Sequence, residues 1–273
     1  MLLLARRVPK AARKRSETLL TPWLCSIFDP CRDVSKLAEQ SFQLLYDGKD
    51  YMTFLSENME EKIKWILEDL EKYLKSTKSS LSDLKLVSVH EAEIRLSRVL
   101  IKSFRALRRV MSVMLHSSSN LTEKTLAVSK LDWNVWSCLG SNGGKKVKYD
   151  SAVTKAAHST FQVILSKGSN ITIKWLKEKK ERMKRYTELV VGGLFVEKTR
   201  ENHHVMCNSM LLFLKQCPTC WSCVSIEKIL LPRLWSFLRH GCYGSDLYDS
   251  MFVFRSMVPK EIEERDEFLT NWF

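Results

Sequence analysis

The chain has 273 residues, of which 45% are apolar, an ordinary fraction for a globular protein with a core in one large or two small domains. Its nine glycines and six prolines are too few for a fold rich in hairpins, and no apolar run reaches the roughly 18 residues of a transmembrane helix. The 44 basic and 31 acidic residues give a net charge of +13, which suits a polyanion partner or simply lysine-rich solvated helix faces.

Residues 1–18 are predicted to form a basic, flexible leader. Six Lys and Arg residues lie between positions 6 and 15, with no acidic residue before Glu17. Mitochondrial transit peptides share this pattern, and the run KAARKR resembles a nuclear signal. A disordered basic tail or a misplaced start codon explains it as well. The remaining residues, 19–273, are predicted to be one helical region.

A helix-turn-helix unit is predicted at the start of this region. The Thr-Pro pair at positions 21–22 opens a short apolar helix, and the Asp-Pro pair at positions 29–30 ends it. Asp33 then begins a second helix that runs through Leu45. The apolar residues of the first helix share one face: Trp23, Leu24, Ile27 and Phe28.

Two long amphipathic helices are predicted next, over residues 51–74 and 91–115. The stretch between them, 76–86, is polar and Ser-rich, so we expect a mobile loop there. In the second long helix, cations recur at steps of three and four residues opposite the apolar face. These cations are Arg95, Arg98, Lys102, Arg105 and Arg109.

A Gly- and Lys-rich stretch at 140–148 is the clearest break in the chain and is predicted to be a second mobile loop. A helix over 149–165 follows, and another from about Ile171 carries the run KWLKEKKERMKR. Three of its lysines complete a candidate basic binding surface with the five cations above: Lys177, Lys180 and Lys184. This surface could follow a phosphate backbone; the alternative is a solvated face that binds nothing. The aromatic residues lie at core spacing, so sequence-specific reading of a nucleic acid is not predicted.

The segment 202–238 predicts a pair of helices separated by the turn CPTCWSC. Two thiolates at CxxC spacing can reach one zinc ion. The turn's cysteines have several potential co-ligands nearby: Cys217, Cys220 and Cys223, with His203, His204, Cys207, His240 and Cys242. No second matched CxxC pair exists, and the apolar neighbours favour packed structural thiols, so no metal site is predicted. Eight cysteines without a convincing secretory leader indicate reduced thiols in an intracellular protein.

Helix pairs with short connections and no strand alternation predict an all-α fold, a HEAT/ARM-like α-solenoid of antiparallel helix pairs. The apolar C-terminal residues Phe268, Leu269, Trp272 and Phe273 lack the polar character of a cap, so we expect a fragment of a longer array. No nucleophile motif, phosphate loop or HExxH occurs. Catalytic and cofactor-binding residues are therefore not predicted.

Several segments, in order, resemble the N-terminal HEAT-repeat region of the listerin family, large E3 ubiquitin ligases of ribosome-associated quality control. They are LLTPWLCSIFDPCRDVSKLAEQSFQLL, RLSRVLIKSFRALRRVM, KLDWNVWSCLGSNGGKKVKYDSAVTKAAHSTFQVILS, and NHHVMCNSMLLFLKQCPTCW followed by LLPRLWSFLRHGCYG. In that family an apolar helix runs to a Cys-Trp pair, and the next helix opens near a proline. The similarity covers most of positions 19–273 at low identity.

The resemblance implies a non-catalytic docking region of a listerin-like ligase that targets stalled nascent chains on the large ribosomal subunit. In that family a C-terminal RING holds zinc and recruits the E2. This chain has no such ligand array, so we expect it to hold no cofactor and to have no ligase activity alone. The implied partners are the large ribosomal subunit and a NEMF-like factor, without a membrane, and the implied location is the cytosol. The alternative is a generic HEAT-repeat scaffold or adaptor that binds a protein partner and is unrelated to ubiquitin.

Overall fold

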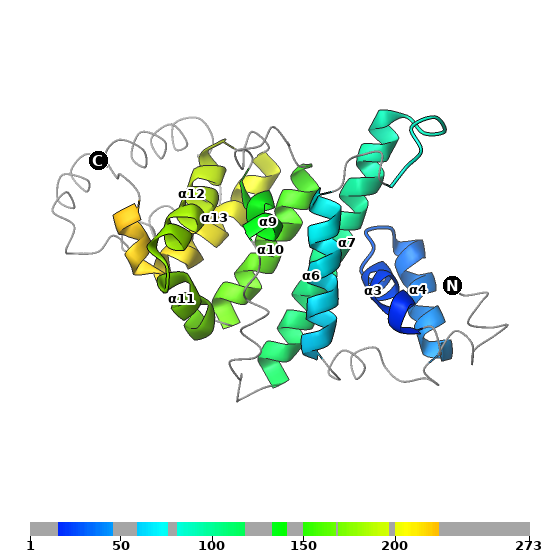
Figure 1. The fold of residues 1–273 in the computed structure, drawn as a ribbon, viewed down its shortest axis with the longest axis horizontal. Helices are drawn as coiled ribbons and strands as arrows, with labels where there is room; N and C mark the ends of the chain where they lie inside the picture. Colours follow the sequence, from blue (N-terminus) through cyan, green and yellow to red (C-terminus); the bar gives the residue numbers. More distant parts are fainter. Residues whose placement is uncertain are drawn as a thin grey trace. The chain divides into compact units, whose positions relative to one another are not determined.

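The computed structural model describes residues 16–45, 59–75, 81–117, 133–140, 150–167, 169–196 and 200–223. These residues are helical apart from turns, which confirms the prediction of an all-α fold (Figure 1). The regular stacking of a solenoid stays a prediction. The elements in chain order are α3 (Ser16–Ile27), α4 (Arg32–Leu45), α6 (Met59–Lys75), α7 (Val89–Ser117), α9 (Trp133–Trp136), η2 (Ser137–Leu139), α10 (Ser151–Lys167), α11 (Ser169–Lys177), α12 (Lys180–Val196), α13 (Arg200–Gln216) and η3 (Pro218–Cys223).

The chain divides into two units, Met1–Trp136 and Ser137–Phe273. In the first unit, α3 and α4 form the predicted helix pair. The indole of Trp23 packs edge-on against Phe42, with ring centres 5.8 Å apart, and its Nε1 donates a hydrogen bond to the carbonyl of Ala38 at 3.0 Å. Burying a large aromatic surface together with its polar N–H joins the two helices at one point.

An ion pair fixes the turn between α3 and α4 to α7. Asp29 follows the end of α3, and its carboxylate accepts hydrogen bonds from Arg98 Nε at 2.9 and 3.1 Å. The same carboxylate accepts the backbone N–H of Cys31 at 2.9 Å, just before α4 begins. The Asp29 side chain is only 4% exposed, whereas that of Arg98 is 42% exposed. A nearly buried anion is thus compensated by a half-exposed cation and a backbone N–H.

The helices α6 and α7 run antiparallel and form the centre of the first unit (Figure 1). Both helices were predicted to be amphipathic, and their most buried apolar residues are Ile63, Ile66, Leu70, Phe104 and Leu107. The short helix α9 adds Trp136, whose ring centre lies 6.2 Å from that of Phe104. Ser88 caps α7 by accepting the N–H of Glu91 at 3.2 Å.

In the second unit, α10 packs against α13 through polar bonds as well as apolar contacts. Gln162 donates to the Val205 carbonyl at 2.7 Å and to Ser209 Oγ at 3.0 Å. Toward the start of both helices, Asn202 donates to the Ser151 carbonyl at 3.0 Å. Residue numbers rise together along both helices, so α10 and α13 run parallel, with α11 and α12 between them in the chain. The apolar residues buried on these two helices include Phe161, Ile164, Met206, Met210 and Phe213.

The backbone of Leu139 and Gly140 makes an unusually close approach to α12. A Cβ atom placed on Gly193 would lie 2.7 Å from the Leu139 carbonyl oxygen, and one placed on Gly140 would lie 2.7 Å from a Leu189 methyl group. The same Leu139 oxygen is 2.9 Å from Nε2 of the buried His158 in α10. Glycine is therefore required at position 193 for space, and a single carbonyl joins η2, α10 and α12.

Most predicted helix limits agree with the structure, but the predicted start of the first helix does not. The helices α4, α7 and α10 begin within two residues of their predicted starts. The first helix, however, begins at Ser16, so the prediction that the Thr-Pro pair opens it is incorrect and Pro22 lies inside α3. A proline removes one backbone hydrogen bond from a helix, but burial of Trp23, Leu24 and Cys25 on the following turn offsets this loss.

Other predicted segments fall only partly on the described residues. Within 76–86, residues from 81 onward form turns in which Asp83 Oδ1 accepts the N–H of Lys85 and the Asp83 carbonyl accepts that of Leu86, both at 2.9 Å. Predictions for residues 1–15, 46–58, 141–149 and 224–273 lie outside the described residues. Among the helices that the structure describes, none combines the length and apolarity that crossing a bilayer requires.

Replacing Arg98 with Ala should lower the free energy of unfolding by roughly 1–3 kcal/mol, because the carboxylate of Asp29 stays buried without its cation. Replacing Arg95 with Ala is the matched control, since Arg95 pairs with Glu91 of its own helix at the surface. That change should cost less than about 0.5 kcal/mol. Urea unfolding followed by circular dichroism measures both. Equal losses for the two variants would show that the Asp29 pair is not a structural link.

Substitutions at the adjacent glycines 192 and 193 should have opposite effects on stability. Gly193→Ala places a methyl group against the Leu139 carbonyl and should destabilise the protein by about 1–3 kcal/mol. Gly192→Ala meets no atom within 4 Å, and alanine favours the helix, so it should stabilise by roughly 0.5–1 kcal/mol. Thermal melting of the two variants checks the sign, and a shift in the same direction for both would contradict the close approach.

Candidate basic binding surface

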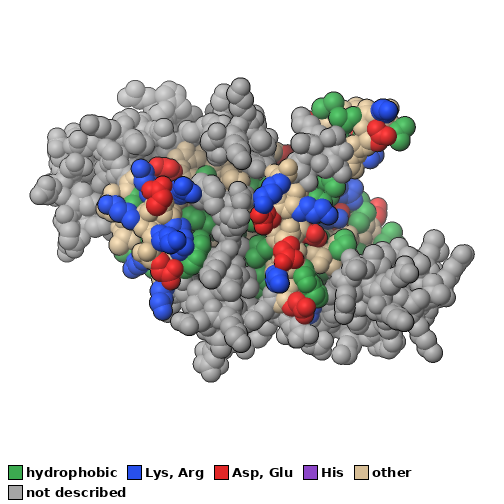
Figure 2. Space-filling view, in the orientation of Figure 1, with side chains coloured by type: hydrophobic (Ala, Val, Ile, Leu, Met, Phe, Trp, Pro, Cys, Tyr) green, Lys and Arg blue, Asp and Glu red, His purple; other side chains and the backbone are tan. Residues whose placement is uncertain are grey.

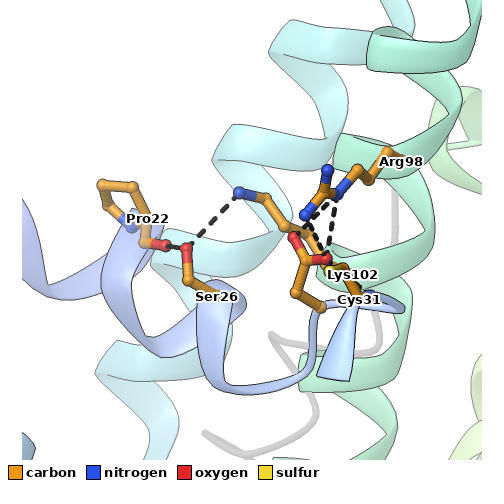
Figure 3. Close-up of polar contacts among 6 residues, drawn as sticks. Pro22, Ser26, Cys31, Arg98 and Lys102 are labelled. Atoms are coloured by element: carbon orange, nitrogen blue, oxygen red, sulfur yellow. Dashed lines mark hydrogen bonds and ion pairs between the residues drawn. The ribbon is translucent and has the colours of Figure 1, made fainter. Parts of the chain in front are cut away.

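The predicted cations on α7 fall into different environments. Arg98 pairs with Asp29 at 2.8 Å, and Lys102 Nζ lies 3.5 Å from Ser26 Oγ, so both point toward the end of α3 (Figure 3). The hydrogen bonds that Arg98 donates to the Asp29 carboxylate raise the pKa of Arg98 above its usual value. Two of the five predicted cations on this helix therefore hold the first unit together as well as carrying charge.

The other cations of α7 lie at the surface. Arg95 is exposed and pairs with Glu91 at 2.8 Å, and Arg105 and Arg109 are exposed farther along the helix. Arg108 is exposed too, although it was not among the cations predicted from the sequence. Its position three residues after Arg105 places it one turn farther on, and this i,i+3 spacing was the available signal.

The basic run KWLKEKKERMKR does not form one helix, contrary to the sequence prediction. Lys177 ends α11 and Lys180 begins α12, with a break at Glu178 and Lys179. The backbone N–H groups of residues 182 and 183 both bond to the Lys179 carbonyl, at 3.0 and 3.1 Å. The lysines at 177, 180 and 184 therefore surround a corner between two helices instead of following one helix.

Arg182 closes this corner. Its guanidinium group lies over the ring of Trp175, 4.0 Å from the ring centre, and donates a hydrogen bond to the Trp175 carbonyl. That carbonyl belongs to the last turn of α11, where no helical N–H remains to bond it. A guanidinium group is planar and carries several N–H donors. It can therefore stack on the indole ring and at the same time donate a hydrogen bond to the adjacent carbonyl.

The corner is also anchored to the core of the second unit. Trp175 packs edge-on against Tyr186 of α12 at 5.9 Å, and Tyr186 stacks on Phe161 of α10 at 6.1 Å. Phe161 in turn contacts Phe213 of α13 at 6.2 Å. This row of rings links α11 and α12, which form the corner, to two further helices, α10 and α13, so the backbone that carries the lysines is anchored to the core.

Lysine is the main source of unneutralised charge at the corner. Glu178 pairs with Arg182 and Glu181 pairs with Arg185, each at 3.4 Å, so the corner's two acidic residues are each held by an arginine. Within the described part of the chain, the exposed lysines there form no ion pair: Lys177, Lys179, Lys180 and Lys184. Figure 2 shows the Lys and Arg side chains gathered over α11 and α12, at the left of the view. We call these four residues the lysine corner.

The cysteine turn beside this corner packs into the protein. The turn predicted here is present as the short helical turn η3, and Cys217 and Cys220 are buried whereas Cys223 is half-buried. Burial raises the pKa of the Cys217 thiol to about 11, although the nearby cation of Lys177 acts in the opposite direction. Burial likewise raises the pKa of Cys220. Burial thus favours the protonated form of both thiols.

The other potential zinc ligands do not gather around this turn. His203 is buried, while His204 is exposed and lies 3.1 Å from the amide of Asn208 on its own helix. Across the ranges that the structure describes, no group of three or more His, Cys, Asp or Glu side chains is arranged to hold a metal ion. His240 and Cys242 lie outside those ranges.

Comparison with known proteins places this helical framework in a family. The family model described as the N-terminal domain of the E3 ubiquitin-protein ligase listerin matches residues 1–258. The listerin of Xenopus tropicalis is 24% identical over 274 aligned positions, covering 98% of this chain and 15% of the relative. That of Gallus gallus is 24% identical over 264 positions, covering 94% of this chain and 14% of the relative. No solved structure matches.

The chain thus spans about one seventh of the length of these relatives. The family match extends through both units and includes the α7 cations and the lysine corner. The family resemblance deduced from the ordered helix segments is confirmed, and the chain belongs to the listerin N-terminal domain family.

Proposed function

We propose that this chain is the N-terminal docking region of a listerin-like E3 ubiquitin-protein ligase and that it contacts the large ribosomal subunit. The relatives are named as E3 ubiquitin-protein ligases. The ribosome is a polyanion, and a positively charged surface without internal counterions is attracted to it at long range. The observation that supports docking is the lysine corner, which is exposed and unneutralised within the described residues.

In this proposal the chain itself performs no chemistry. Ubiquitin transfer belongs to a RING elsewhere in the ligase, which recruits the E2 and holds zinc. This chain would position that machinery near a stalled nascent chain in the cytosol, with a NEMF-like factor as its second partner.

The second candidate function, a scaffold or adaptor for a protein partner, is favoured by exposed apolar side chains around the start of α7. Leu84 and Leu86 extend from the turn that Asp83 organises, and Val89 and Ile94 follow on the helix. Leu86 is 83% exposed. Exposed apolar groups on an ordered turn suit a protein contact better than a phosphate backbone. This surface could serve in either function.

Cosedimentation with purified large ribosomal subunits tests the docking proposal. The chain should pellet with large subunits, and the bound fraction should fall as salt is raised from about 50 to 200 mM, because counterions compete for the phosphates. Small subunits at equal RNA concentration are the control for nonspecific charge attraction. Absence of salt-sensitive binding, or equal binding to both subunits, would contradict the proposal.

Replacing Leu86 with Ser separates the two candidate functions. This exposed side chain contributes little to folding, so the melting temperature should stay within the error of the measurement. Ribosome binding through charge should be unchanged, whereas recognition of a protein through the apolar turn should weaken by about tenfold or more. Loss of subunit binding in this variant would favour a protein contact over a phosphate contact.

A further inference from the structure

We infer that the contact with the large subunit is made by the lysine corner and that its ligand is the phosphate backbone of folded RNA. This inference rests on the proposed function and deepens it by choosing between two basic surfaces and naming the chemical group bound. The lysine corner and the exposed arginines of α7 carry similar charge, but their surroundings differ in ways that decide between them.

The first difference is neutralisation. On α7, a phosphate at Arg98 or Arg95 would compete with the ion pair to Asp29 or Glu91, so the arginines that remain as alternatives to the lysine corner are the exposed Arg105 and Arg108. At the lysine corner, the two acidic residues are already held by arginines, which leaves the lysines to solvent. A phosphate reaching the corner therefore displaces only water and counterions.

The second difference is that two of the lysines do not stabilise their own helix, although Lys177 lies favourably in the last turn of α11. Lys179 and Lys180 stand at the start of α12, where the helix dipole is positive and a cation costs roughly 0.3–1 kcal/mol. A solvated face with no other role would gain stability from acidic residues at these positions. Unpaired cations at an unfavourable place are better explained by an external anion than by folding.

The third difference concerns the kind of partner. The large apolar side chains that are exposed among the described residues all belong to the first unit, between positions 37 and 94. The described residues around the lysine corner thus include none of the exposed large apolar anchors around which protein interfaces form. Its aromatic neighbours are occupied too, because Trp175 lies under Arg182 and against Tyr186. Without free rings to stack on bases, contact is limited to phosphates, independent of sequence.

Neutralising two lysines one turn apart tests this assignment. The variant Lys180→Gln/Lys184→Gln removes two charges from the corner, and Arg105→Gln/Arg108→Gln removes two exposed charges one turn apart on α7. Each protein is titrated with purified large subunits and, separately, with a fluorescently labelled RNA hairpin, over a range of salt concentrations. The slope of log affinity against log salt counts the phosphate contacts.

We expect the corner variant to lose about 2 from the magnitude of this slope with both ligands, since each duplex phosphate contact contributes roughly 0.9. The α7 variant should keep the wild-type slope and affinity. The melting temperature of the corner variant should equal or exceed that of the wild type, because Lys180, in the first turn of α12, opposes the helix dipole. Weaker binding together with undiminished stability would support a binding role for these lysines and exclude misfolding as the cause.

The possible failures are distinguishable. If the wild type binds large subunits and the corner variant binds them equally well, the inference is overturned while the proposed function stands. If the wild type binds the hairpin through the corner but does not bind subunits, the proposed function is overturned and the phosphate surface remains. Binding to neither ligand overturns both. A slope that falls only in the α7 variant transfers the contact to α7.

Discussion

The ends of helices impose the constraint on which both units depend. At each end several backbone N–H or C=O groups have no helical partner, and a chain with few glycines must satisfy them with side chains. Asp29 does this between α3 and α4, Ser88 before α7, and Arg182 between α11 and α12. The Asp150 side chain accepts the N–H of Ala152 at the start of α10. By bonding these backbone groups, each of the four side chains fixes the turn at which the next helix begins, and so fixes the direction of that helix.

Arginine and lysine have different roles as a result. Arg98 and Arg182 each satisfy groups on a neighbouring element, since a planar guanidinium can stack and donate in several directions. The lysines of the corner make no such contacts within the described residues and extend into solvent. Net charge alone does not distinguish these roles, because an internal ion pair leaves the sum of +13 unchanged. The lysine corner is a better candidate binding surface than α7 because its lysines, unlike Arg98, are not used to hold neighbouring elements of the protein.

Local periodicity was sufficient to predict the helices whose packing is regular. The apolar faces of α6, α10 and α13 follow a spacing of three and four residues, and the structure buries them as expected. It failed where tertiary contacts outweigh local preference. Pro22 lies within α3 because the next turn is buried, and the lysine-rich run breaks because Arg182 and Trp175 stabilise a corner. Lysine and glutamate favour helix everywhere in that run, so no local signal marks the break.

The candidate surface was predictable as residue types but not as geometry. Spacing on α7 selected Arg98 and Lys102 along with the truly exposed cations, because periodicity defines a face and not what covers it. The partner of Arg98 lies 69 residues away in the sequence. A contact between residues so far apart produces no periodic pattern in the sequence from which it could be predicted. The family resemblance could be found from ordered segments because it depends on the succession of helices, which sequence reports well.

The separation of Asp29 and Arg98 also bears on the order in which the first unit is completed. Closing a loop of this length costs chain entropy before any contact is gained, which slows a step that requires it. During synthesis from the N-terminus, the carboxylate emerges long before its cation, so the turn between α3 and α4 stays incompletely compensated until α7 has formed. The helices α3 and α4 are thus synthesised before the rest of the described unit, but their connecting turn is among the last parts to gain its tertiary contacts. Any fragment that ends before α7 leaves Asp29 without its cation.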